Sequence, residues 1–172
     1  MTQMLDGLLA LSRLAAQPIV PETVDLSRLA DTIAEELRAT EPGRQASIVI
    51  QPGLRVEGDR TLLRVALENL LGNAWKYTAR RPQARIAFGC TGDGPDTVFH
   101  VTDDGAGFDM RFADRLFGVF QRLHSAADFP GTAVGLAGVQ RIVRRHGGRI
   151  WAEAEPGRGA RFHFTLWEKG RP

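Results

Sequence analysis

The sequence predicts an α+β fold in which helices cover one face of a single sheet. Helical and extended patterns are mixed along the 172 residues without strict alternation. The chain also closes with two consecutive strand patterns joined by a tight turn. Its composition, 43% apolar and 24% charged, is ordinary for a globular domain. A chain of this length normally forms one domain with a sizeable core.

Composition excludes several classes of protein. The net charge of +2 is too small to indicate nucleic-acid binding. Cys90 is the single cysteine, so no intrachain disulfide can form, which fits a reducing compartment. No run of 18 apolar residues exists, so we expect no membrane insertion and no signal peptide. We therefore expect a cytoplasmic domain with no nucleic-acid partner.

The first segment, residues 2–16, has the pattern of an amphipathic helix. Met4, Leu8, Leu11 and Ala15 follow heptad spacing, with room for only two heptads. Two interpretations stay open: the end of a helical bundle, or a helix packed on its own domain. Pro18 and Pro21 then break the chain, so we divide it into residues 1–20 and 21–172.

The remaining elements follow from periodicity and capping residues. Asp25 and Asp59 are expected to cap helices, and residues 104–133 have mixed helix and loop character. Predicted helices span residues 26–40, 60–78 and 134–145. Predicted strands span residues 46–50, 54–57, 84–90 and 97–103, followed by a hairpin around residues 156–157.

The stretch LENLLGNAWKYT, residues 67–78, places polar groups on one stripe of an otherwise apolar helix. Asn69 and Asn73 are four residues apart and share a face, and Lys76 follows on the same face. An amide oxygen can ligate Mg²⁺, and a lysine one turn further can neutralise phosphate. The alternative is an ordinary polar helix surface.

Two glycine-rich segments complete the pattern. In DDGAGF, Asp103 ends a strand and Gly105 and Gly107 follow, so a flat ligand can approach the backbone closely. A carboxylate there can accept a hydrogen bond from an exocyclic amine such as that of adenine. In GTAVGLAGVQRIV, residues 131–143, glycines lead into a helix N-terminus, which favours phosphate. Each segment alone could also be a plain turn or helix junction.

In combination and order, these segments resemble the catalytic domain of bacterial sensor histidine kinases, within the GHKL ATPase superfamily. LENLLGNAWKYT is similar to the N box, DDGAGF to the G1 box, RLFGVFQRLH to the F box and GTAVGLA to the G2 box. The chain as a whole is most similar to kinase domains of the bacteriophytochrome type. The resemblance implies the Bergerat fold, a two-layer sandwich with a mixed sheet of about five strands backed by three helices.

The resemblance implies that the site binds ATP and Mg²⁺. Asn73 would ligate the metal, Asn69 would support the metal and phosphates, and Asp103 would accept the adenine amino hydrogen. Lys76 would meet phosphate oxygens, and Arg122 would reach the γ-phosphate. Phe117 and Phe120 would anchor a lid between the G1 and G2 boxes. The residues implied to line, approach or cover the nucleotide are Tyr77, Gly105, Gly107, Gly131, Thr132, Gly135 and Leu136.

One position indicates the phosphoryl acceptor. Superfamily members that activate water or a serine hydroxyl carry a glutamate one turn before the metal asparagine, where this chain has Asn69. Glu68 points about 100° away around the helix. A histidine nucleophile needs no base there because its neutral ring has a free lone pair. This favours transfer to histidine over hydrolysis or serine phosphorylation.

The sequence departs from the family pattern at two positions. Ala133 stands where the G2 box usually has glycine, which would cost roughly 1–2 kcal/mol if the residue needs a positive φ. Gly138 stands inside the following helix, where it costs about 1 kcal/mol in helix propensity and leaves a packing gap. These residues favour the alternative function, a degenerate domain that docks partners with little ATP turnover.

None of the four histidines lies in the context of a phosphoacceptor. His100 and His163 fall in strands and His124 in the mixed segment. His146 falls at a helix C-terminus, where a partial positive charge suits the dipole. The partners implied are therefore a histidine-bearing helical dimerisation domain, in cis or in trans, and the receiver domain of a response regulator. Residues 1–20 would be the end of that helical domain and its linker.

Overall fold

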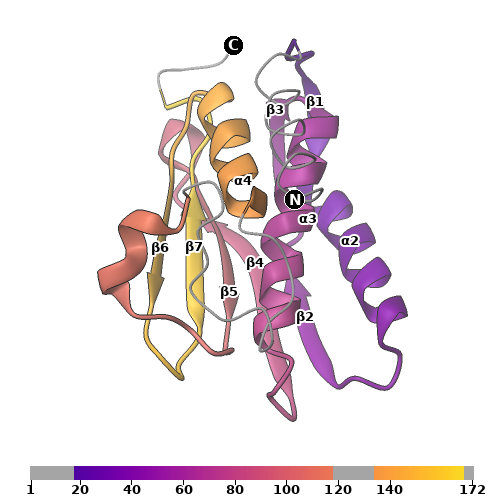
Figure 1. Cartoon of the computed structure of the whole chain (residues 1–172). Coiled ribbons are helices and arrows are strands. Elements are labelled where there is room, and N and C mark those ends of the chain that lie inside the picture. The colour runs from indigo at the N-terminus through magenta and orange to yellow at the C-terminus, as the bar shows by residue number, and fades with distance from the viewer. Residues whose placement is uncertain (1–17, 118–133, 169–172) are drawn as a thin grey trace, which may run out of the picture.

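The computed structural model of the chain describes residues 18–117 and 134–168. Figure 1 shows three helices lying on one face of a five-stranded sheet, which confirms the predicted α+β sandwich. The helices are α2 (Leu26–Thr40), α3 (Arg60–Tyr77) and α4 (Val134–Arg145). The strands are β1 (Glu22–Asp25), β2 (Ala46–Ile50), β3 (Arg55–Gly58), β4 (Ala84–Thr91), β5 (Val98–Asp103), β6 (Ile150–Ala154) and β7 (Ala160–Phe164).

The main sheet has the strand order β2-β4-β5-β7-β6. β2 pairs with β4 in parallel, and the other three pairs are antiparallel, so the sheet is mixed as expected. β1 and β3 form a separate two-stranded antiparallel sheet. The order places the end of β5 in the middle of the main sheet.

The face of the main sheet that carries the helices supplies the core. Phe99 and Val101 of β5 and Phe162 and Phe164 of β7 are buried there, and the Phe99 and Phe164 rings stack at 5.1 Å between centroids. His100 and His163 alternate with these residues and lie opposite each other on the other face. Both histidines therefore lie in strands, as the alternating pattern predicts.

Both predicted helix caps are confirmed. The side chain of Asp25 accepts a hydrogen bond from the backbone N–H of Arg28, and that of Asp59 accepts one from Leu62. Each carboxylate satisfies a donor that the first helical turn leaves free. The caps explain why the observed starts of α2 and α3 coincide with the predicted ones.

The differences from the predictions are small and local. Residues 22–25 form β1, where no strand was expected, because its pairing with β3 is not a local signal. The strand predicted over 54–57 lies one residue later, at Arg55–Gly58. The short 3-10 turn Gly94–Asp96 was also not predicted. A second 3-10 turn, Met110–Arg115, lies in the segment for which mixed helix and loop character was predicted. The predicted helix over 2–16 lies outside the described residues.

The expectation of a partial positive charge on His146 is wrong. The residue does follow the C-terminus of α4, but it is fully buried. Its Nδ1 lies 2.8 Å from the carbonyl oxygen of Ile142, and its Nε2 accepts the backbone N–H of Asp59 at 3.0 Å. A nitrogen that accepts a hydrogen bond carries no proton, so the ring is neutral, and burial lowers its pKa. His146 thus fastens α4 to the start of α3.

Within residues 18–117 and 134–168, no helix is both long and apolar enough to cross a membrane.

Candidate functional site

The polar stripe of α3 faces away from the helix positions that form the core. Asn69 is half-buried, and its Nδ2 donates to the carbonyl of Val65 at 2.8 Å. Asn73 is half-buried as well, and its side chain has no hydrogen-bond partner among the described residues. Lys76 is exposed. The buried residues of the same helix are Leu62, Leu63, Ala66, Leu67, Leu70, Leu71, Ala74 and Trp75.

Asp103, at the end of β5, is a buried carboxylate with only 6% of its surface exposed. Its Oδ1 accepts the backbone N–H of Gly105 at 2.9 Å. No described cation pairs with it, and burial raises its pKa to about 6 despite backbone hydrogen bonds from Gly105 and Ala160. A carboxyl group in this setting has acceptor capacity that a ligand can use.

The loop after Asp103 is packed so tightly that glycine is required at two positions. A Cβ on Gly105 would overlap the carbonyl of Tyr77, the last residue of α3. Gly107 has a φ of +63°, and a Cβ there would overlap the carbonyl of Glu155. The loop therefore runs between the end of α3 and the β6–β7 turn, as close to both as backbone allows.

The start of α4 meets the polar stripe of α3. A Cβ built on Gly135 would lie 2.7 Å from Oδ1 of Asn69. Leu136 is 9% exposed. Phe117 packs edge-on against Phe162 of β7, with ring centroids 6.4 Å apart. Asn69 and Gly135, 66 positions apart in the sequence, are thus neighbours in space.

Most of the remaining predicted site residues lie outside the described part of the chain. Phe120, Arg122, Gly131 and Thr132 lie outside the described residues, and so do Ala133 and His124. Gly138 is buried inside α4, which continues through it without a break. Tyr77 is half-buried, and its backbone carbonyl lies beside Gly105.

Sequence reasoning missed Arg81, which follows α3 by four residues. Its guanidinium donates to the carbonyl oxygens of Asp104 at 2.7 Å and of Gly105 at 3.3 Å, and a third, short bond joins it to that of Gly157. The residue sits in a loop with no periodicity, and its partners are backbone atoms far along the chain. No sequence signal could have singled it out.

Glu68 lies on the surface, away from the site. Its carboxylate pairs with Arg64 at 2.6 Å, and Arg64 also pairs with Glu36 of α2. This confirms that the glutamate next to Asn69 in sequence points elsewhere. Among the described residues, no group of three histidine, cysteine, aspartate or glutamate side chains could hold a metal ion.

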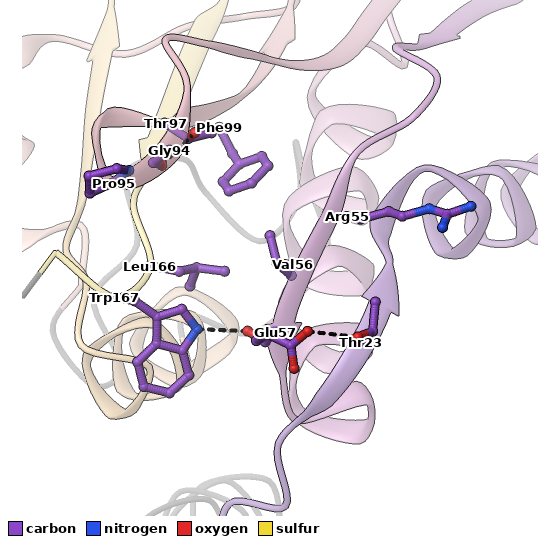
Figure 2. A pocket seen from close by; sticks show the side chains of 10 residues that line it. All are labelled: Thr23, Arg55, Val56, Glu57, Gly94, Pro95, Thr97, Phe99, Leu166 and Trp167. Atoms are coloured by element: carbon purple, nitrogen blue, oxygen red, sulfur yellow. Dashed lines mark hydrogen bonds between the residues drawn. The ribbon is translucent and has the colours of Figure 1, made fainter. Parts of the chain in front are cut away.

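A cavity of about 540 Å³ lies at the other end of β5 from Asp103, between the small sheet and the main one. Figure 2 shows Val56, Phe99, Leu166 and Trp167 around it. Two hydrogen bonds join its lining residues: the Trp167 indole donates to the carbonyl of Glu57, and Thr23 donates to the Glu57 carboxylate. The cavity shares none of the site's residues.

Fold and site together define a nucleotide-binding domain, and comparison with known proteins gives its family. Residues 58–170 match the model of the family described as histidine kinase-, DNA gyrase B- and HSP90-like ATPase. The chain therefore belongs to this family.

The relatives are histidine kinases, including phytochrome-type kinases. The chain is 35% identical over 172 residues to cyanobacterial phytochrome A of Nostoc sp., covering 99% of this chain and 22% of that protein. It is 36% identical over 167 residues to the methanogenesis regulatory histidine kinase FilI of Methanothrix harundinacea, covering 96% and 19%. The chain thus spans about a fifth of the length of these relatives.

Solved structures give the same result. The mycobacterial sensor histidine kinase MprB is 29% identical with a TM-score of 0.72, covering 84% of this chain and 97% of that one. Full-length ShkA in complex with AMPPNP is 28% identical with a TM-score of 0.76, covering 95% and 35%. The chain has the fold of the ATP-binding catalytic domain of histidine kinases.

Proposed function

We propose that this domain binds Mg·ATP and transfers the γ-phosphoryl group to a histidine of a helical dimerisation domain. That phosphohistidine then passes the group to an aspartate in the receiver domain of a response regulator. The observation that carries the proposal is the buried carboxylate of Asp103, which has no cation partner among the described residues and lies beside the Cβ-free backbone of Gly105.

Asp103 and Gly105 suit the adenine end of the nucleotide. The ionised carboxylate accepts a hydrogen from the exocyclic amino group, and the glycine backbone leaves room for the flat base. Tyr77 lines the base or sugar, while Gly107 keeps the loop in its tight path. Phe117 anchors the segment that leads to the lid through its contact with Phe162.

The stripe on α3 suits the phosphate end. The amide of Asn73 has no hydrogen-bond partner among the described residues, so its oxygen can ligate Mg²⁺, and Asn69 supports it one turn earlier. The metal shields the phosphate charge when it is bound. Lys76 adds positive charge, and the free backbone N–H groups at the start of α4, around Gly135 and Leu136, favour phosphate. Arg122, Phe120, Gly131 and Thr132 are proposed to complete this end.

The residue one turn before Asn73 favours histidine as the acceptor, because it is Asn69 and not a glutamate. Asn69 cannot take up a proton, and Glu68 is held in its ion pair with Arg64. A neutral histidine ring attacks with its own lone pair, forming the N–P bond as the bond to the β-phosphate oxygen breaks and ADP leaves. The site then needs only to position the reactants and neutralise charge.

The test is a calorimetric titration of Mg·ATP and Mg·ADP into the purified chain, repeated with Asp103→Asn. The proposal expects saturable binding that requires Mg²⁺ and weakens at least tenfold in the variant, equivalent to about 1.4 kcal/mol. If the folded protein binds no nucleotide at millimolar concentration, a partner-docking role without ATP turnover replaces the proposal.

A further inference from the structure

Arg81 fastens the loop that carries the adenine-facing residues. Its guanidinium contacts three backbone carbonyls that come from two separate segments, Asp104 and Gly105 after β5 and Gly157 in the β6–β7 turn. Planar guanidinium groups present several donors in fixed directions, so one side chain can hold three acceptors at once. Lysine, with a single ammonium group, cannot reproduce this arrangement.

The loop is otherwise held by backbone bonds to the same neighbours. The N–H of Ala106 donates to the carbonyl of Tyr77 at 3.0 Å, and its carbonyl accepts the N–H of Gly157 at 2.7 Å. The hydrogen bonds of Arg81 therefore add to a network that joins the end of α3, the loop and the β6–β7 turn. Within this network, the N–H of Gly105 donates a hydrogen bond to Oδ1 of Asp103.

We propose that Arg81 is a positioning residue that sets the selectivity of the site for adenine by holding the Gly105 peptide against Asp103. Arg81 acts through that peptide, and nothing requires it to touch the nucleotide. The inference rests on the proposed function, because it assigns the adenine amino group to Asp103. A loosened loop lets the carboxylate turn, and a hydrogen bond that depends on its direction is lost.

The side chain of Arg81 is exposed, so its bonds contribute modestly to folding. A merely structural residue would change stability, or would change the affinity of every nucleotide by the same factor. A positioning residue instead changes the ratio between a nucleotide that has the amino group and one that lacks it. This ratio is the measurement that separates the two roles.

The experiment compares Mg·ATP with the triphosphate of purine riboside, the same nucleotide without the exocyclic amino group. Dissociation constants are measured by calorimetry for the 172-residue wild type, Arg81→Met and Arg81→Lys. Asp103→Asn serves as the reference for complete loss of amino-group recognition. Arg85→Met is the matched control, because Arg85 holds Asp104 through its backbone N–H and carbonyl only.

We expect the wild type and Arg85→Met to prefer ATP by about tenfold. Arg81→Met should lose most of this preference, as Asp103→Asn does, with its affinity for the purine analogue changed less than twofold. Thermal unfolding confirms that each variant is folded, and Arg81→Lys provides the result if Arg81→Met does not fold.

Four outcomes overturn the inference. An unchanged preference in both Arg81 variants, or an equal loss of affinity for both triphosphates, means that Arg81 is structural only. If the wild type binds neither triphosphate, the proposed function itself fails, and the inference fails with it. If the wild type binds the two triphosphates with equal affinity, Asp103 does not recognise the amino group and the inference fails.

Discussion

Asp103, the proposed partner of the adenine amino group, lies in an environment that disfavours its charged form. Its carboxylate is buried against backbone and has no described cation to offset the loss of water, so its pKa rises to about 6. The unfolded chain has an ordinary aspartate with a pKa near 3.9. Between these values the folded state binds more protons than the unfolded state, so its stability falls as the pH rises through this window.

Replacing Asp103 with asparagine should therefore stabilise the free domain in a pH-dependent way. Relative to the wild type, the variant should gain about 2–3 kcal/mol in unfolding free energy between pH 4 and pH 7.5. Chemical denaturation of both proteins at the two pH values measures this change. A difference between the proteins that stays constant with pH would contradict the raised pKa.

The contribution of His146 to stability depends on pH in the opposite direction from that of Asp103, and the role of His146 is structural. Burial lowers its pKa, so the folded state binds fewer protons than the unfolded state as the pH falls below about 6.5. The stabilisation that neutral His146 provides is complete above that pH and is lost as the pH falls toward the lower, folded-state value.

His146→Gln should cost about 2 kcal/mol of stability at pH 7.5, because it breaks the bond to Asp59 and the packing against Trp167. The loss of stability should be smaller at pH 5, because the wild type is itself less stable there: its ring stays neutral in the folded state, whereas the unfolded chain takes up a proton. Urea denaturation at both pH values tests this. An equal cost at the two values would mean that the ring does not titrate differently on folding.

At the scale of elements, the site depends on how closely α4 approaches α3. Asn69 and Gly135 are neighbours, so the first turn of α4 limits the side chain that is proposed to support the phosphate end. The C-terminal end of α3 is held in turn by Arg44, which donates to the carbonyl of Trp75 at 2.6 Å and lies over its ring at 4.1 Å. These contacts keep the polar stripe in one orientation.

Gly135→Ala should weaken nucleotide binding severalfold while leaving stability within about 1 kcal/mol, because the helix gains propensity as Asn69 is displaced. Gly72→Ala is the matched control: it lies in α3, and a Cβ there meets nothing within 4 Å. The control should gain up to about 1 kcal/mol and bind nucleotide normally. Calorimetry measures the nucleotide affinity of both variants, and thermal unfolding measures their stability. Normal binding by Gly135→Ala would contradict the predicted role of this contact.

At the scale of the whole molecule, the proposed chemistry needs a second domain. Incubated alone with Mg·ATP, this chain should form no phosphohistidine. Addition of the histidine-bearing helical domain of one of its histidine-kinase relatives should give acid-labile label on that domain, and Asp103→Asn should abolish it. Label that appears on a serine of a partner instead would overturn the choice of acceptor.

Local signals were sufficient for most of the elements. Asp25 and Asp59 mark the starts of α2 and α3, and alternating residues place Phe99 and Phe162 in strands that each have one buried face. Asn73, Asp103 and Gly105 also stand out in the sequence, because their residue types and spacing suit a nucleotide.

Only the tertiary structure decided the rest, because the deciding contacts join residues far apart in the chain. The strand Glu22–Asp25 is polar and short, and it exists through its pairing with β3. His146 is neutral because Asp59 donates to it across 87 positions, which outweighs the helix dipole. Arg81 gains its role from carbonyls up to 76 residues away. The sequence by itself thus determined which groups are proposed to bind the nucleotide, whereas burial and long-range contacts, which only the tertiary structure shows, determined the surroundings of those groups.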